Sequence, residues 1–202
     1  MANNRDPVIR PVPIRSLRPT QLTVGLIEVE TKRSSWRKDN KKGEFLGRHM
    51  IPVVIGPKDR PYVIDHHHLA RALLDEGQEE VLIQPVAHLS ALSQEHFWRF
   101  LDNDGLLHPF DEHGERRPYS EIPKSIARLK DDPFRSLAGA VRTAGGYAKE
   151  TRPFVEFIWA DYFRTSFKAR DIRHHWNRTV EEAVAMARHH DAHFMPGWCG
   201  PS

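Results

Sequence analysis

Residues 51–74 read Ile-Pro-Val-Val-Ile-Gly-Pro-Lys-Asp-Arg-Pro-Tyr-Val-Ile-Asp-His-His-His-Leu-Ala-Arg-Ala-Leu-Leu, and this stretch decides the predicted fold. Ile51–Ile55 is a continuous apolar run, which is typical of a strand buried on both faces. Gly56–Arg60 predicts a hairpin connection, and Tyr62–Ile64 predicts the returning strand. The residues after His66 have the apolar spacing of an amphipathic helix. The stretch therefore predicts two antiparallel strands followed directly by a helix.

The junction between the second strand and this helix contains Asp65, His66, His67 and His68. A helix start presents unpaired backbone N–H groups and the positive end of the helix dipole, which suit a phosphate or carboxylate group. An acid and three imidazoles at this position indicate a binding or reaction site. The alternative is purely structural: Asp65 caps the helix by accepting an N–H two or three residues on, and the histidines are solvated or bonded to carbonyls.

The rest of the N-terminal half is predicted from local patterns. The expected elements are a proline-broken edge strand over 8–15, a short helix opening at 19–21, a helix over 24–32, a mobile polar loop over 33–48 and a strand over 81–87. Gly77 is expected to end the helix that follows His66 in a left-handed conformation. Pro85 indicates an edge or a bulge in the strand around it.

From residue 90 onward helical patterns replace strands. The expected helices run over 92–101, over 133–144 with a stop at Gly145-Gly146, over 153–167, and from a capping box at Thr179–Glu182 to about His190. The aromatic stripe between Phe154 and Phe163 is more typical of a core than of a cofactor site. The predicted class is therefore α+β: a mixed-sheet half over 1–90 and a helical extension over 91–202 packed on the same core.

Composition narrows the function classes. The chain has 202 residues, 39% of them hydrophobic and 28% charged, which is typical of a globular protein. No apolar run approaches the ~20 residues of a membrane span, and the first residues lack the apolar stretch of a signal peptide. We therefore expect a cytoplasmic protein with no membrane partner. The single cysteine, Cys199, allows no internal disulfide and is an unfavourable nucleophile in a tail.

Net charge gives little information about partners. It is +3 with a sequence pI of about 9.1, which is too small an excess to argue for nucleic acid. Basic side chains do gather over 32–42, where the default interpretation is a solvated face.

The order of elements and the Asp-His-His motif resemble the ParB/sulfiredoxin superfamily, and in particular its ParB-like nuclease group. The similarity is carried by Ile51–Ile55, by Tyr62-Val-Ile-Asp-His-His-His-Leu-Ala-Arg71, and by Pro19-Thr-Gln21 together with Gly25. The superfamily core covers about residues 8–90, and the narrower group extends through the helical half.

This resemblance implies nucleotide chemistry. ParB proteins hydrolyse CTP, sulfiredoxin uses ATP, and free serine kinase uses ADP, with the helix-start motif holding phosphates. Asp65 matches the motif aspartate, and His67 and His68 match its paired histidines. The kinases also carry a glutamate base on the preceding helix, for which Glu28 or Glu30 is the candidate here.

The chain also departs from the family patterns. His66 replaces the glycine of the kinase motif, and Leu69 stands where that motif has arginine. Arg71, two residues after Leu69, lies about 200° farther round the helix than Leu69. The cysteine that sulfiredoxins have in this motif is absent, so sulfiredoxin chemistry is excluded. The Gly-Glu-Arg-Arg motif of partition proteins is absent too.

A second His/Asp cluster, containing His190, Asp191 and His193, follows the last predicted helix. If the C-terminus folds back over the first site, these side chains and Asp65 could form a metal centre for a transition metal of unknown identity. The structural alternative is a polar helix end, where histidine complements the helix dipole.

The main hypothesis is a small enzyme that acts on a phosphorylated substrate, by nucleotide-dependent phosphoryl transfer or by hydrolysis, with ATP, ADP or CTP and Mg²⁺. Catalysis is assigned to Glu28, Glu30, His67 and His68, and nucleotide binding to Asp65, His66, His67, His68, Arg71 and Lys32. The first alternative is a nuclease or nucleic-acid-binding protein. The second is a metal-dependent small-molecule enzyme that uses both histidine clusters. The sequence predicts no oligomeric state.

Overall fold

The computed structural model describes residues 11–201, so residues 8–10 of the predicted edge strand lie outside the described part. The chain folds into two compact units. The first contains Val29–Pro109, Pro118–Leu129 and the chain up to Leu22, and the second contains Thr23–Glu28, Phe110–Arg117 and Lys130 onward. The sequence predicts a single division after residue 90, whereas these units interleave along the chain. The predicted α+β class is confirmed.

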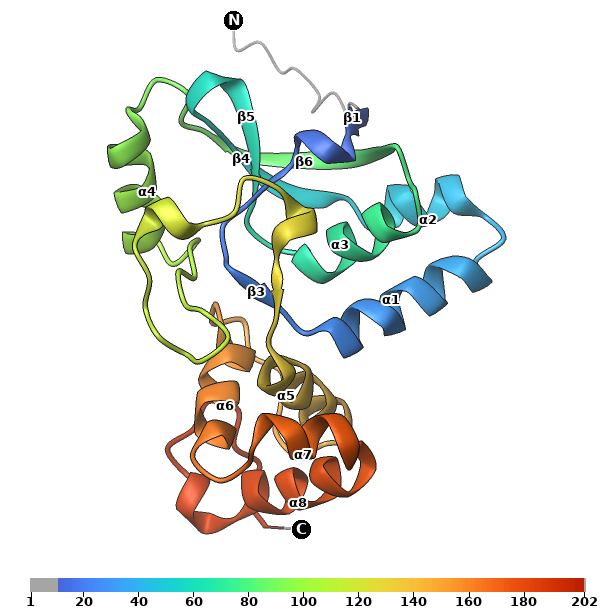
Figure 1. Cartoon of the computed structure of the whole chain (residues 1–202), viewed down its shortest axis with the longest axis vertical. Coiled ribbons are helices and arrows are strands. Elements are labelled where there is room, and N and C mark those ends of the chain that lie inside the picture. The colour runs from blue at the N-terminus through green and yellow to red at the C-terminus, as the bar shows by residue number, and fades with distance from the viewer. Residues whose placement is uncertain (1–10, 202) are drawn as a thin grey trace, which may run out of the picture. The chain divides into compact units, whose positions relative to one another are not determined.

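The first unit contains a five-stranded mixed sheet with the order β1-β6-β4-β5-β2 (Figure 1). Its strands are β1 (Pro11–Pro13), β2 (Arg18–Pro19), β4 (Ile51–Gly56), β5 (Arg60–Val63) and β6 (Glu80–His88). β4 pairs antiparallel with β5 and parallel with β6, β1 pairs antiparallel with β6, and β2 pairs parallel with β5. The predicted hairpin is therefore confirmed. Val53, Val54 and Val63 are fully buried in it.

Pro85 marks a bulge in β6, as predicted. Val53 pairs with Pro85, but the next residue, Val54, pairs with Ala87, so Val86 is left without a partner in the register. Proline cannot donate a hydrogen bond to the ladder, and a bulge accommodates that loss.

The helices of the first unit are α2 (Lys42–Arg48), α3 (His67–Asp75) and α4 (Gln94–Asn103), with short 3₁₀ turns at Ile14–Ser16, Pro57–Asp59, Tyr119–Glu121 and Ile126–Arg128. The long helix α1 (Leu26–Lys38) starts in residues of the second unit and continues into the first. α3 ends as predicted, because Gly77 has a positive φ of 76° and donates its N–H to the Leu74 carbonyl.

The predicted loop over 33–48 is wrong, because these residues form the end of α1 and all of α2. Trp36 and Phe45 are both 7% exposed and pack edge to face with ring centroids 5.3 Å apart. The ammonium group of Lys42 lies 4.2 Å from the Trp36 ring centroid. Only these two aromatic residues are buried in a polar, basic segment, so the hydrophobic period that signals a helix is missing here.

The predicted short helix at 19–21 is also wrong. Pro19 ends β2, where it pairs with Val63 of β5. Proline fixes φ in a range that suits both a first helical turn and an edge strand. Pairing with a strand more than 40 residues away decides between them.

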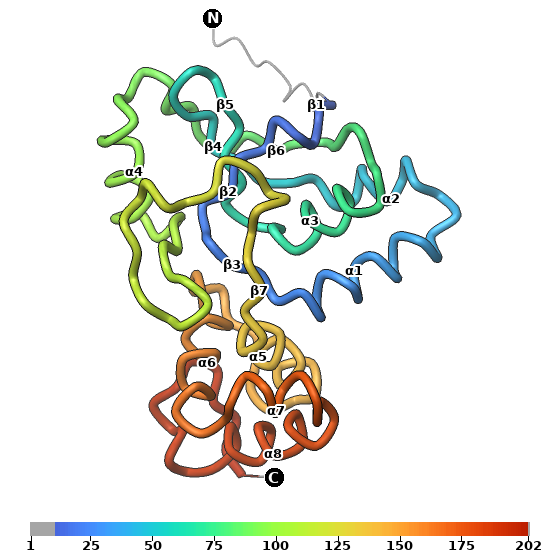
Figure 2. Tube along the Cα trace, in the orientation of Figure 1, coloured from blue at the N-terminus to red at the C-terminus, as the bar shows by residue number. Residues whose placement is uncertain are grey.

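The second unit contains the parallel pair β3 (Thr23–Val24) and β7 (Lys130–Asp131), and its longer elements are helices (Figure 2). Its helices are α5 (Pro133–Thr143), α6 (Val155–Arg164), α7 (Ala169–His174) and α8 (Trp176–Arg188), followed by a 3₁₀ turn at His190–Ala192. The aromatic stripe is core, as expected: Trp159 and Phe163 are fully buried, and Tyr147 stacks on Trp159 with centroids 4.4 Å apart.

The predicted capping box at Thr179 is wrong. α8 begins three residues earlier, at Trp176. The Thr179 hydroxyl donates to the carbonyls of His175 and Asp171, 3.0 and 3.3 Å away, and so bonds back along the helix. The Thr-x-x-Glu spacing is present, but tertiary packing determines where the helix starts.

No helix among residues 11–201 combines the length and the apolarity that crossing a bilayer requires.

Gly25 makes a close backbone contact within the second unit that predicts a stability effect. A Cβ atom at this position would lie 2.3 Å from the Ser136 Oγ and 2.7 Å from the Ser136 nitrogen. We expect Gly25→Ala to lower the free energy of unfolding by about 1–3 kcal/mol, because overpacking forces the backbone of α5 to shift. Urea denaturation measures the loss. Gly43→Ala in α2 is the matched control, because its Cβ would meet nothing within 4 Å, and we expect that variant to be unchanged or more stable.

Candidate functional site

The candidate site lies at the junction between β5 and α3, within the first unit. His66 occupies the N-cap position in a left-handed conformation with φ 63° and ψ 25°. Asp65 Oδ1 accepts the N–H of the adjacent His66 at 2.6 Å and does not cap the helix two or three residues on. In the described part of the chain, no side chain caps α3 at this N-cap residue. The structural interpretation of Asp65 as a helix cap is therefore not supported, and the start of α3 keeps its positive dipole end.

The His66 imidazole is exposed but held in place. Its Nδ1 lies 3.1 Å from the carbonyl oxygen of Met50, which precedes β4. A carbonyl oxygen can only accept a hydrogen bond, so Nδ1 carries the proton and a neutral His66 has its lone pair on Nε2. The ring therefore has one fixed orientation.

His67 is buried and points inward instead. It is 4% exposed, and its Nε2 accepts the backbone N–H of Thr20 at 3.2 Å. Burial lowers the pKa of the His67 imidazole to about 3; the neighbouring His68 adds to this shift and the Asp65 carboxylate partly offsets it. His67 is thus neutral at pH 7, and its Nε2 is occupied. This geometry suits a positioning role, and it does not support contact between Nε2 and a phosphate. His68 is 7% exposed.

Thr20 is the residue at this junction that sequence reasoning missed, and Gln21 follows it. Thr20 is 1% exposed, and its hydroxyl donates to the Val63 carbonyl at 2.8 Å. Its own carbonyl accepts the N–H of His108 at 2.9 Å, beside a parallel bridge between Gln21 and His108. Gln21 is 4% exposed. The signal was present, because the Pro19-Thr-Gln match and the histidine motif carried the same resemblance, yet nothing in the sequence shows that they meet.

Glu30 does not lie at the junction. Its carboxylate pairs with Arg33 at 2.8 Å and Arg37 at 3.3 Å, and both arginines also bind Glu76, the residue that follows α3. Glu28 pairs with Arg135 of α5 at 3.0 Å, within the second unit. The proposed role of Glu28 as a base remains a prediction.

The two predicted cationic binding residues differ in their surroundings. Arg71 Nε lies 3.0 Å from both carboxylate oxygens of Asp75, and its Nη1 donates to the Leu129 carbonyl at 3.1 Å. These contacts hold Arg71 along α3, away from its start. Lys32 is exposed on α1 and has no acidic partner among residues 11–201.

The C-terminal histidine cluster is bonded to its own backbone. His190 and His193 stack with ring centroids 5.1 Å apart, and His193 Nδ1 lies 3.0 Å from the His190 carbonyl. The carboxylate of Asp191 lies 3.3 Å from His189 Nδ1. Across residues 11–201, no three His, Cys, Asp or Glu side chains gather closely enough to hold a metal ion. The predicted centre that joins His190, Asp191 and His193 to Asp65 would span both units, and it stays a prediction.

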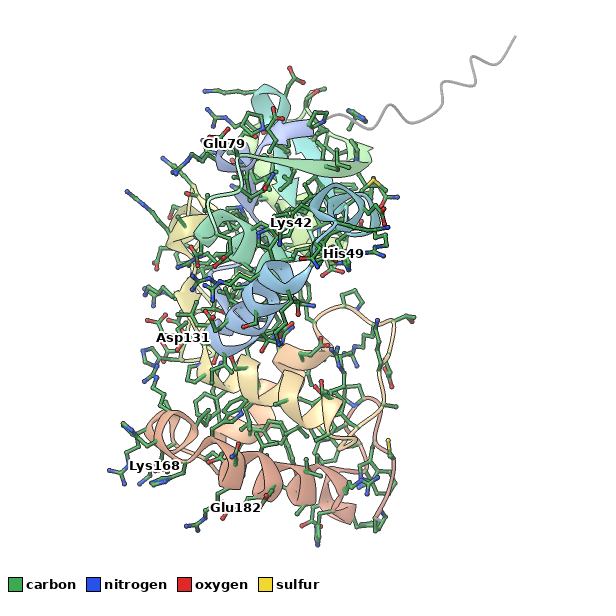
Figure 3. The ribbon with its side chains drawn as sticks, turned by 90° about the vertical axis from the view of Figure 1, so that its right-hand side faces the viewer. Lys42, His49, Glu79, Asp131, Lys168 and Glu182 are labelled. Atoms are coloured by element: carbon green, nitrogen blue, oxygen red, sulfur yellow. The ribbon has the colours of Figure 1, made fainter. Side chains whose placement is uncertain are left out.

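The Glu76 ion pairs predict an acid-dependent loss of stability. Hydrogen bonds from Arg37 and Arg33 lower the pKa of Glu76 to about 2 from an ordinary value near 4.5. A carboxyl group with a lowered pKa stabilises the fold above its unfolded-state pKa, and this contribution is lost as pH falls through the folded-state value. We expect the stability advantage of the wild type over Glu76→Gln to shrink as pH falls from about 4.5 toward 2. Urea denaturation at pH 6.5 and pH 3 measures it, with Glu79→Gln (Figure 3), an exposed neighbour, as the control that should show little change.

Comparisons with known proteins agree with this fold. Residues 10–165 match the model of the family described as "Putative ParB-like nuclease". No curated protein matches the chain. The crystal structure of protein Atu1540 from Agrobacterium tumefaciens is similar, with a TM-score of 0.92 and 48% sequence identity over 98% of this chain and 99% of that one. The resemblance to free serine kinase is not shown by these comparisons. The family match covers most of the chain, and the chain therefore belongs to the ParB-like nuclease family.

Proposed function

We propose that this protein is an enzyme that binds a phosphate group of a nucleotide at the start of α3 and hydrolyses or transfers it. The observation that carries the proposal is the start of α3, where the N-cap residue His66 makes no side-chain cap and where the Asp65 carboxylate and the His66 imidazole are exposed. Helix-start N–H groups and the helix dipole favour an anion. The resemblance of the Asp-His-His motif to phosphate-binding motifs of the superfamily points the same way.

The side chains have distinct roles in this proposal. Asp65 would share a Mg²⁺ ion with the phosphate oxygens, since carboxylate oxygen is a preferred Mg²⁺ ligand. Backbone N–H groups at the start of α3 would donate to the phosphate. Thr20 and His67 would keep the end of β2 against the start of α3. ATP, ADP and CTP are the nucleotides to test first.

Calorimetric titration and phosphate release with ATP, ADP and CTP test this proposal, each with and without Mg²⁺. We expect at least one nucleotide to bind and to release phosphate. Asp65→Asn should raise the Mg²⁺ concentration needed for half-maximal phosphate release at least tenfold. Asp59→Asn, which changes an exposed acid between β4 and β5, is the matched control and should behave as wild type. If no nucleotide binds and none is turned over, the proposal fails.

A second candidate function, a nuclease or nucleic-acid-binding protein, is favoured by the family description and by charge. Residues 30–48 contain seven Lys or Arg and three Asp or Glu, a net charge of +4 against +3 for the whole chain. These residues span most of α1 and all of α2. Arg33 and Arg37 are paired with Glu30 and Glu76. Lys32 and Lys38, which have no acidic partner among residues 11–201, are the cations that a nucleic-acid backbone would meet there.

Salt dependence distinguishes this candidate from the first. Binding of a labelled 20-nucleotide DNA strand or its duplex should weaken steeply with salt, because phosphate contacts release counterions. The double variant Lys32→Glu/Lys38→Glu should weaken binding at least tenfold, whereas Lys168→Glu in the second unit should not. Absence of binding at low salt would exclude this candidate.

A further inference from the structure

Four rings near the end of the second unit form an exposed aromatic patch. Its members are His190, His193 and Phe194, which are exposed, and Trp198, which is half-buried. Phe194 is 68% exposed, against 44% for Phe100 of α4 in the first unit. A single exposed apolar side chain is common on a protein surface, whereas a group of neighbouring rings marks a candidate contact surface.

The rings of the aromatic patch are held in fixed positions. His190 and His193 stack with centroids 5.1 Å apart, and Trp198 meets both rings edge to face at 6.2 and 6.4 Å. Phe194 meets His193 edge to face at 5.7 Å. Trp198 Nε1 donates to the His189 carbonyl at 3.1 Å, and His193 Nδ1 lies 3.0 Å from the His190 carbonyl. A ligand that binds here therefore has few rotatable side chains to order.

The loop that follows α5 runs beside the aromatic patch. Tyr147 and Trp198 pair in an antiparallel bridge, and the Ala148 N–H donates to the Gly197 carbonyl at 2.7 Å. The end of α8 meets the start of the same loop, since a side-chain nitrogen of Arg188 donates to a carbonyl there at 3.2 Å. Residues 145–152 and 188–198 are therefore neighbours within the second unit.

These two segments carry three cations. Lys149 and Arg152 are exposed, and Arg188 is half-buried. The two acids of the same segments already have partners. The Glu150 carboxylate accepts a backbone N–H at 2.6 Å, and the Asp191 carboxylate lies 3.3 Å from a histidine ring nitrogen. The aromatic patch thus has a border whose cations can attract an anionic ligand.

We propose that the aromatic patch binds single-stranded nucleic acid by stacking bases on its rings. Every base has a π face, so phenylalanine, tryptophan and histidine rings stack on bases without reading their sequence. Lys149, Arg152 and Arg188 contact the phosphates of the same strand. Rings bordered by cations favour an unpaired strand over an apolar protein partner, which has no use for the cations, and over a duplex, whose base faces are covered.

This inference goes beyond the proposed function. The aromatic patch lies in the second unit, whereas the start of α3 and the cations Lys32 and Lys38 lie in the first.

Fluorescence anisotropy of labelled oligothymidylate and oligouridylate with the full-length protein at low salt tests the proposal, and the two strands distinguish DNA from RNA as the ligand. We expect Phe194→Ala to weaken binding about tenfold, the usual effect of removing one stacking ring. The variant should fold, because this side chain is mostly exposed. Phe100→Ala is the matched control and should bind as the wild type does.

A strand of the same length without bases separates stacking from charge. The wild type should bind this abasic strand about tenfold more weakly than oligothymidylate, and Phe194→Ala should bind it as the wild type does. The double variant Lys149→Glu/Arg152→Glu should weaken the binding of both strands by a similar factor, because both offer the same phosphates.

Three results would overturn the proposal. The first is equal affinity of the wild type and Phe194→Ala for every strand with bases, even if Lys32→Glu/Lys38→Glu abolishes binding. The second is a wild type that binds no strand at low salt, a failure that leaves nucleotide turnover at the start of α3 to its own assay. The third is a wild-type dimer in light scattering that Phe194→Ala converts to a monomer, since a second copy of the chain would then cover the aromatic patch.

Discussion

Replacing His67 with alanine is expected to lower the free energy of unfolding by about 3 kcal/mol and to abolish ligand binding at the start of α3. The backbone N–H of Thr20 would lose its acceptor in a place where Thr20 is 1% exposed, and an unsatisfied buried donor costs about 1–3 kcal/mol. The missing ring also leaves a void, which adds to the loss. Urea denaturation measures the stability, and nucleotide titration measures the binding.

The same histidine predicts a pH dependence whose sign is fixed. The folded-state pKa of His67 is about 3, whereas a histidine in an unfolded chain titrates near pH 6.5. Between these values the unfolded state binds a proton that the folded state does not, so the free energy of unfolding falls as pH falls. The slope for one proton is about 1.4 kcal/mol per pH unit. Stability from this source is complete above pH 6.5 and is lost toward pH 3.

His67→Gln isolates that effect. Its side-chain oxygen can accept the Thr20 N–H, but glutamine does not titrate. We expect it to be less stable than wild type at pH 7 and to lose stability less steeply between pH 6.5 and 4.5. Parallel curves for the two proteins would show that His67 does not remain neutral in the folded state.

Replacing Asp132 with alanine is expected to destabilise the second unit by about 3–5 kcal/mol, the usual cost of breaking a buried ion pair. Asp132 is fully buried; Arg164 binds its two oxygens at 3.1 and 2.6 Å, and one of these oxygens also caps α5 through the Phe134 N–H. Removing the carboxylate leaves the half-buried guanidinium of Arg164 without its principal partner.

Asp161→Ala is the matched control for this prediction. Asp161 pairs with the same arginine at 3.2 Å, but its side chain is 54% exposed. Exposed ion pairs contribute at most about 1 kcal/mol, so the control should lose little. Thermal and urea denaturation of both variants measure the difference. Equal losses would mean that the burial of Asp132 does not set the strength of its pair.

Local sequence patterns predicted the structure correctly where the buried residues follow from their immediate neighbours in the sequence. The apolar run of β4, the bulge at Pro85 and the left-handed Gly77 were predicted because each depends on neighbouring residues alone. The aromatic residues of α6 were predicted to be core for the same reason. Secondary structure that buries its own apolar face leaves a readable period.

Local patterns gave wrong predictions where contacts between residues far apart in the sequence determine the structure. The segment around α2 is mostly polar, and it is helical because of packing between Trp36 and Phe45 and of ion pairs between α1 and Glu76. Glu76 lies 43 residues after Arg33, and no local sequence period indicates such a contact.

The candidate site shows the same limit. Its position and four of its residues were predicted from the motif at the start of α3. Thr20 was missed as a site residue because its bond to His67 spans 47 residues. The difference between His66 and His67 was missed because adjacent histidines look equivalent until their burial and bonding are known.

Two-dimensional ¹H–¹⁵N NMR of the labelled protein, titrated with ATP, ADP or CTP and Mg²⁺, shows directly whether a nucleotide phosphate binds at the start of α3. A phosphate at the start of α3 should shift the backbone amide signals of His67, His68 and Leu69 more than any others, because these N–H groups begin the helix. We expect saturable shifts confined to this junction and its neighbours. No shifts up to millimolar nucleotide, or the largest shifts elsewhere in the chain, would contradict it.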